Sequence, residues 1–127
     1  MTEKAIVITT DDKIEVRDLE VKDGSLLEPL QQIVGGYIEI VHPMRLCDGP
    51  VPLAMIVNEE GIIEGLPINA IASVLYGADI HGSFIHGNVA ILEQGERDGD
   101  PDIVGLSPYV CECLSTWFKT SFHIIKN

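Results

Sequence analysis

Hydrophobic and polar positions along the first twenty residues follow the two-residue period of β-strands. The run from Lys4 to Thr9 is rich in β-branched residues, and the run from Lys13 to Leu19 alternates polar with apolar side chains. Between them, Thr10-Asp11-Asp12 has the composition of a turn. These features predict an N-terminal hairpin over residues 1–20.

Apolar residues recur at helical spacing, three and four positions apart, in three later segments. The predicted helices run from Leu26 to the pair Gly35-Gly36, from Leu66 to Leu75 before Gly77, and from Ser107-Pro108 to about Lys119. Ser25 and the pair Ser107-Pro108 favour the starts of the first and third helices, and Gly35-Gly36 and Gly77 favour the ends of the first and second.

Short apolar runs rich in β-branched residues predict the remaining strands. They are Tyr37–Val41, Leu53–Val57, a short return strand at Ile62–Glu64, one or two strands within Ile80–Leu92, and an edge strand or tail at Phe122–Ile125. The acidic stretch from Glu93 to Asp102 and the segment from His42 to Pro52 are expected to be loops. Strands outnumber helices, so we expect an α+β fold with a mainly antiparallel sheet of about five to six strands and about three helices on one side.

The length of 127 residues favours one domain. We expect a single domain over 1–127, composed of the hairpin at 1–20, a central core at 26–92, and a C-terminal helix and tail at 103–127. Hydrophobic residues make up 46% of the chain, which is too many for a disordered protein.

The charge of the chain argues against some classes of function. The chain has 20 acidic and 8 basic side chains, and residues 23–118 contain only Arg45 and Arg97 as basic residues. The net charge of −12 argues against binding to nucleic acid or to an anionic membrane, because both need clustered basic side chains. The acidic surface either keeps a small protein in solution or attracts a basic partner.

Three cysteines favour a reducing, cytoplasmic setting, because small secreted domains usually contain an even and denser set. Cys111 and Cys113 lie about 200° apart around a predicted helix, which is poor geometry for one metal ion. Cys47 could join them only through the tertiary structure. We therefore expect structural thiols, no metal site and no cofactor.

The segment from His81 to Asn88 is the most polar stretch within an apolar strand pattern. His81 and His86 are five residues apart and point to opposite faces of an unbroken strand, so they do not form a metal-binding pair. Two glycines in the segment could let a ligand approach the backbone amides, with the histidines and Asn88 as polar anchors. The alternative is a sheet with two half-exposed histidines.

Two other polar residues stand in unusual places. Asn69 lies in the first turn of the second predicted helix, where it either caps the helix or turns outward to a ligand. Glu39 lies inside an apolar strand, where its carboxylate faces solvent, pairs with Arg45 or lines a pocket.

Four segments together resemble a known family. They are Gly35–Val41, Ile56–Gly61, Leu66–Ala72 and Ile80–Val89. This pattern, over roughly residues 26–92, resembles a small domain family of bacteriophages and mobile elements that is known only as a domain of unknown function. The family offers no catalytic residues to transfer to this chain.

The resemblance implies an accessory role against host defence. Our first hypothesis is a non-catalytic protein that binds and sequesters a small ligand, such as a nucleotide immune signal. The candidate ligand-binding residues are Arg45, Glu39, Asn69, His81, His86 and Asn88. We also expect a homo-oligomer, because a site at an interface would double the few cations available for phosphates.

Two alternatives remain. The first is an acidic, DNA-mimic-like decoy that inhibits a basic host defence protein in the cytoplasm, which the charge favours. The second is a small hydrolase, although the sequence contains no GxSxG motif or other catalytic constellation.

Overall fold

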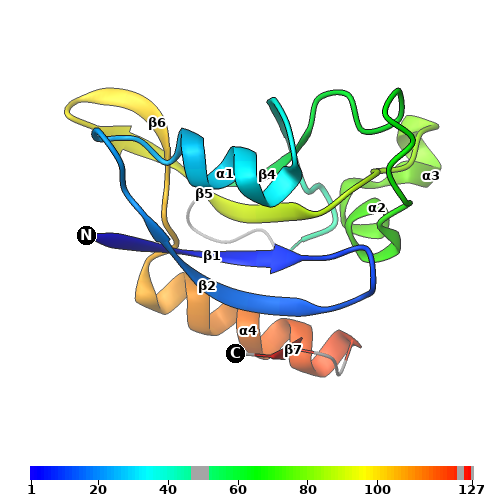
Figure 1. The fold of residues 1–127 in the computed structure, drawn as a ribbon. Coiled ribbons are helices and arrows are strands. Elements are labelled where there is room, and N and C mark those ends of the chain that lie inside the picture. Colours follow the sequence, from blue (N-terminus) through cyan, green and yellow to red (C-terminus); the bar gives the residue numbers. More distant parts are fainter. Residues whose placement is uncertain (47–51, 123–124, 127) are drawn as a thin grey trace.

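A mainly antiparallel sheet organises the chain (Figure 1). The structure is a computed structural model that describes residues 1–46, 52–122 and 125–126. Its elements are β1 (Thr2–Ile8), β2 (Ile14–Glu20), α1 (Leu27–Val34), β3 (Ile38–Val41), β4 (Leu53–Asn58), α2 (Ala70–Tyr76), α3 (Ala78–His81), β5 (Val89–Arg97), β6 (Asp100–Val104), α4 (Pro108–Phe122) and β7 (Ile125–Lys126). The predicted α+β class is confirmed.

The strands are ordered β3-β4-β5-β1-β2-β7, and β6 pairs with the second half of β5. The first six strands of the chain pair antiparallel, and β7 joins β2 in parallel. The predicted N-terminal hairpin is confirmed, with Thr2 opposite Glu20 at one end and Ile8 opposite Ile14 at the other.

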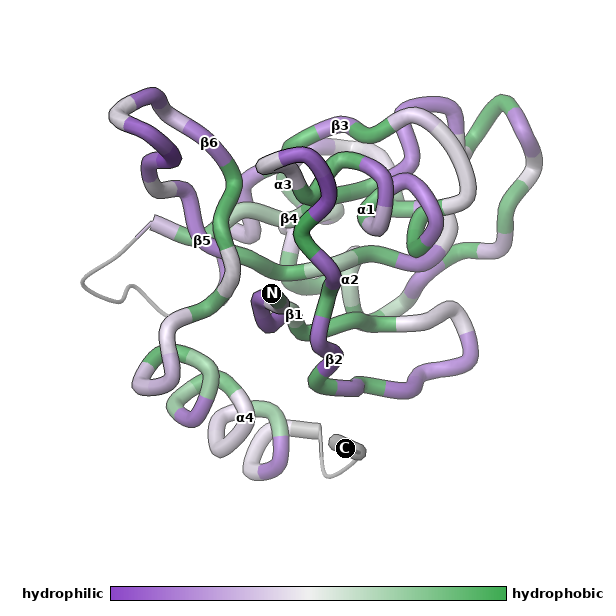
Figure 2. The backbone as a smooth tube through the Cα atoms, turned by 60° about the vertical axis from the view of Figure 1, so that its left-hand side comes forward, coloured by the Kyte–Doolittle hydropathy of each residue, from purple (hydrophilic) through white to green (hydrophobic). Residues whose placement is uncertain are grey.

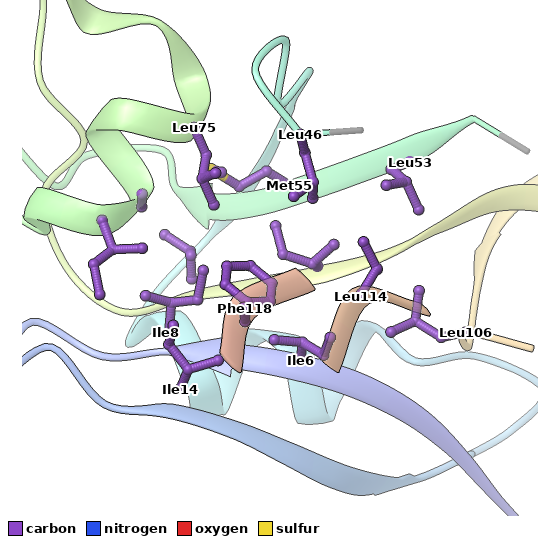
Figure 3. Close-up of a cluster of buried hydrophobic side chains, with 14 of the residues drawn as sticks. Ile6, Ile8, Ile14, Leu46, Leu53, Met55, Leu75, Leu106, Leu114 and Phe118 are labelled. Carbon is purple, nitrogen blue, oxygen red and sulfur yellow. The ribbon is translucent and has the colours of Figure 1, made fainter. Parts of the chain in front are cut away.

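The sheet has a hydrophobic core on each face. One core packs β1, β4 and β5 against α2 and α4, and Figure 3 shows Leu114 and Phe118 of α4 beside Ile6 and Ile8. The other packs alternate residues of the same strands, such as Ala5 and Val7, against α1.

The expectation that the helices lie on one side was wrong, because α1 covers one face and α2 and α4 cover the other (Figure 1). The cause is visible in the central strands. Ala5–Ile8, Leu53–Val57 and Val89–Leu92 are buried without alternation. Strands of this kind must be covered on both faces.

Two of the predicted strands are absent. Residues 62–64 form no strand; they belong to a turn over 59–65 in which the Glu64 amide donates to the Glu60 carbonyl at 2.8 Å. Residues 80–88 are not a strand either, because α3 ends at His81 and the next strand begins only at Val89. Gly82 and Gly87 have φ of +79° and +93°, which a regular strand does not allow.

The expected acidic loop at 93–102 is instead the β5–β6 hairpin, and Figure 2 shows its hydrophilic tip. Asp98 and Gly99 form the turn with φ of +54° and +84°. Two successive positive φ values match the twist of a tight hairpin, and Asp-Gly is a preferred sequence for it.

The last helix begins as predicted, with the Val110 amide donating to the Ser107 hydroxyl at 3.4 Å. It continues to Phe122, beyond the predicted end at Lys119. A terminal edge strand is present at Ile125–Lys126, although residues 123–124 of the predicted segment lie outside the described residues. Residues 47–51 of the predicted 42–52 loop, which include Cys47, lie outside them as well.

Candidate functional site

A hollow of about 420 Å³ opens beside β3, and we call it the Glu39 hollow. Its lining comes from the edge of the sheet, from the turn after β4, from the end of α2 and from the irregular segment before β5. The lining residues are Glu39, Val41, Val57, Asn58, Glu59, Glu60, Gly61, Ile62, Ile63, Tyr76, Ser83, Phe84, Ile85 and His86.

The charged side chains that line this hollow are acidic. Glu39, Glu59 and Glu60 line it, whereas no Lys or Arg of the described residues does. All three side chains are exposed. Within residues 1–46, 52–122 and 125–126, no group donates a hydrogen bond to these carboxylates or forms an ion pair with them. The hollow therefore presents three carboxylates without a cation, next to the rings of Tyr76 and Phe84.

Asn58 fixes the turn that holds two of these carboxylates. Its Oδ1 accepts from the Glu60 amide at 2.7 Å, and its Nδ2 donates to the Val34 carbonyl and to Glu64 Oε1 at 3.1 Å each. Because Asn58 is 6% exposed, these bonds replace water contacts that the buried amide has lost. The side chain thus ties the acidic turn to α1.

Gly61 and His86 bring the opposite walls together. A Cβ on Gly61 would lie 2.6 Å from the His86 carbonyl oxygen, so only glycine permits this approach. The His86 ring binds the Leu66 carbonyl through Nδ1 at 2.8 Å. A carbonyl only accepts, so Nδ1 carries a proton and donates this bond.

Asn69 does not line the hollow but holds the segments around it. Its Nδ2 donates to the carbonyls of Ile8 and Gly87, and its Oδ1 accepts from the Ala72 amide, at 3.0 Å each. The side chain is fully buried. Of the two roles that the sequence left open, the structure shows the helix cap.

The Asn88 side chain also forms a hydrogen bond with another segment of the chain. Its Oδ1 accepts from the Thr10 amide at 3.0 Å, which joins the N-terminal turn to the start of β5. Neither Asn69 nor Asn88 contributes to the hollows described here.

Arg45 lies in a neighbouring hollow of about 480 Å³, which we call the Arg45 hollow. Its Nη2 donates to both carboxylate oxygens of Asp79, at 3.0 and 2.7 Å. Arg45 therefore pairs with Asp79 and not with Glu39. Ile68, Val74 and Phe84 supply apolar lining, and Phe84 borders the Glu39 hollow as well.

His81 does not line the Glu39 hollow but contacts Tyr76, which does. Its ring stacks on Tyr76 with centroids 4.3 Å apart and planes 20° from parallel. Tyr76 and Phe84 were not among the sequence candidates. Phe84 lies in the apolar pattern that was assigned to a strand, yet 56% of it is exposed.

Arg97, the other basic residue of residues 23–118, does not line the Glu39 hollow. It donates to both oxygens of Glu3 at 2.9 and 3.0 Å, and to Asp102 at 3.0 Å. The Arg97 bond lowers the pKa of Glu3, although burial opposes the shift. Both arginines of residues 23–118 are thus engaged with carboxylates.

The described residues contain no group of three His, Cys, Asp or Glu side chains placed to hold a metal ion. Burial raises the pKa of the Cys111 thiol, while Cys113 is exposed, and both are free thiols. Any meeting with Cys47 lies outside the described residues. Across these residues, the helices are all too short or too polar to cross a membrane.

Fold and hollow together define a small α+β domain with an acidic, aromatic-lined depression at one edge of its sheet. The chain belongs to the family described as "Domain of unknown function (DUF3846)", whose model matches residues 1–119. The match confirms the resemblance to a family of unknown function and extends it over the N-terminal hairpin and most of α4. No curated protein and no solved structure matched the chain.

Proposed function

We propose that this protein is a non-catalytic binding protein that holds a cationic group of a basic partner in the Glu39 hollow. The observation that supports the proposal is the set of three carboxylates, Glu39, Glu59 and Glu60, without a described cationic partner. Tyr76 and Phe84 add ring faces, which attract ammonium and guanidinium groups by about 0.5–1 kcal/mol at exposed sites.

The charge of the whole chain supports the same partner. A net charge of −12 produces a negative potential that speeds the encounter with a basic molecule. Long-range attraction of this kind weakens with salt, because the Debye length is only about 8 Å at physiological ionic strength. The proposal corresponds to the acidic decoy, with the hollow as its contact point.

The nucleotide-sequestering alternative receives less support from the geometry. A phosphate at Arg45 would have to displace Asp79, and one at Arg97 would have to displace Glu3. Assembly into an oligomer would double these ion pairs along with the arginines. The Glu39 hollow itself would repel a phosphate.

The hydrolase alternative also has little geometric support. Ser83 and His86 both line the hollow, but His86 Nδ1 binds a backbone carbonyl instead of a carboxylate. No hydrogen bond joins Ser83 to His86 among the described contacts. A serine nucleophile needs an adjacent base for activation.

We also propose that binding takes place in the cytoplasm, where a basic host protein would be met. The free thiols of Cys111 and Cys113 support a reducing compartment.

Calorimetric titration with spermine, a linear tetraamine without a peptide backbone, tests the proposal. Glu39→Gln should weaken spermine binding about threefold, which corresponds to the free energy of one exposed ion pair. Glu112→Gln removes the same charge from an exposed position on α4 and should change the affinity by less than about 1.5-fold. Equal losses in the two variants would show that only net charge matters and would refute the proposal.

The same titration with cyclic and ADP-ribose-type nucleotides tests the alternative. Heat of binding that disappears in Arg45→Ala would favour nucleotide sequestration. We expect no such heat.

A further inference from the structure

Among the described residues, the outer edge of β3 has no strand partner. β3 is the end strand of the sheet, paired with β4 on one side only. No described residue pairs with its other side. An exposed strand edge offers unpaired backbone donors and acceptors to another chain.

The register identifies which backbone groups are available. The Glu59 amide donates to the Tyr37 carbonyl at 2.9 Å, so these two residues form a hydrogen-bonded pair. Hydrogen-bonded and non-hydrogen-bonded pairs alternate along an antiparallel ladder. Glu39 opposite Val57 is therefore also a hydrogen-bonded pair, whereas the N–H and C=O groups of Ile38 and Ile40 point outward.

The open edge lies between two hollows. Glu39 and Val41 line the Glu39 hollow on the α2 side of the strand. A second hollow of about 390 Å³, with Tyr37, Glu60 and Glu64 in its lining, lies between α1 and the start of β3. Side chains of an added strand would alternate between these two sides. Both hollows have carboxylates in their lining, so the edge suits a basic segment.

A second copy of the chain fits this edge poorly. The antiparallel register that joins the outward groups of both copies pairs Ile38 with Ile40 of the other copy. It sets the two Glu39 residues directly opposite each other, and like charges in that position are destabilising. A Lys or Arg opposite Glu39 would instead form a cross-strand ion pair, and Ile40, which is 49% exposed, would gain an apolar neighbour.

We infer that β3 accepts, by strand addition, an extended segment of the partner with the pattern apolar–basic–apolar, whose Lys or Arg lies opposite Glu39. This inference rests on the proposed function and adds the binding mode. The backbone of the segment bonds to Ile38 and Ile40, and its basic side chain enters the Glu39 hollow. Main-chain bonds give affinity in this mode, and the hollows give specificity.

Two synthetic peptides test the inference, one with a central Val-Lys-Val and one with the same sequence N-methylated at the amides that face β3. N-methylation removes the backbone donors and keeps the lysine. We expect the first peptide to bind at least about tenfold more tightly than the second. We also expect it to slow hydrogen exchange at the Ile38 and Ile40 amides.

Ile40→Pro provides a matched change in the protein. Proline removes only the outward N–H at this position, which an edge strand tolerates. The variant should lose at least about tenfold in affinity for the Val-Lys-Val peptide and keep its affinity for spermine. A Val-Glu-Val peptide should not bind the unmodified protein.

The outcomes separate the two proposals. Equal, Glu39-dependent binding of both lysine peptides would overturn strand addition and leave the cationic site intact. Loss of all Glu39-dependent binding, for spermine as well as peptide, would overturn both. Protection of the Ile38 and Ile40 amides that rises with protein concentration alone would show that a second copy covers the edge, and this too would overturn the inference.

Discussion

Replacing Asn69 by Ala should destabilise the fold without removing a ligand contact. The sequence left Asn69 as a helix cap or a ligand-binding residue, and the structure places its side chain at 0% exposure with three hydrogen bonds. Two of these bonds go to backbone carbonyls of distant segments, at Ile8 and Gly87. The third caps α2 at Ala72.

The expected cost follows from these bonds. A typical intramolecular hydrogen bond contributes about 1 kcal/mol net, and loss of an N-cap costs about the same. Asn69→Ala should therefore lower the free energy of unfolding by about 3 kcal/mol, within the roughly 5–15 kcal/mol of a typical domain. Asn69→Ser keeps an acceptor for the cap and loses both donors, so it should cost about 2 kcal/mol.

Urea unfolding followed by circular dichroism measures this difference. Spermine titration at a temperature where all variants are folded provides the second readout, and its affinity should stay within about twofold, since Asn69 does not line the hollow. A loss below about 1 kcal/mol in Asn69→Ala would refute the hydrogen-bond account. Weaker spermine binding at unchanged stability would restore Asn69 as a ligand-binding residue.

Two further predictions concern Glu3 and Gly61. The hydrogen bond from Arg97 lowers the pKa of Glu3 in the folded protein. Ionised Glu3 therefore stabilises the fold above its unfolded pKa of about 4.5. This contribution is lost as the pH falls through the lower pKa of the folded state. The stability difference between the protein and Glu3→Gln, from urea unfolding, should shrink between about pH 6 and pH 3; a constant difference would contradict this. Gly61→Ala should cost about 1–3 kcal/mol in thermal unfolding, because its Cβ would meet the His86 carbonyl; an unchanged midpoint would mean that the walls move apart freely.

The sequence predicted most of the fold because its local signals are strong. Helix ends at Gly35 and Gly77 have positive φ, as the glycine pattern predicts, and the first hairpin follows its alternation. The predictions failed where the same residue composition is compatible with a strand and with a short helix. Ile80, Phe84 and Ile85 belong to an apolar pattern that is typical of a strand, but the glycine at 82 ends a short helix there.

The candidate site was predicted only in part. Glu39 and His86 line the same hollow, which the sequence did not predict, and His81 stacks on Tyr76 in its wall. Arg45 lies in the adjacent hollow. Tyr76 and Phe84 could not be selected, because an apolar residue at helical or strand spacing looks the same whether it faces the core or a cavity.

Several residues from the segments that resemble the family line the hollow or hold its walls in place. Asn58 fixes the acidic turn, Gly61 lets that turn touch the opposite segment, and Asn69 joins this segment to the sheet. Residues of this kind specify the shape of a hollow and carry no information about its ligand. Ligand recognition must therefore come from the other lining side chains, which here are aromatic rings and carboxylates that have no partner among the described residues. Three of the 20 acidic residues behind the net charge of −12, namely Glu39, Glu59 and Glu60, line the hollow beside the edge of β3. A basic strand added to that edge could bond to the backbone of β3 and pair with these carboxylates.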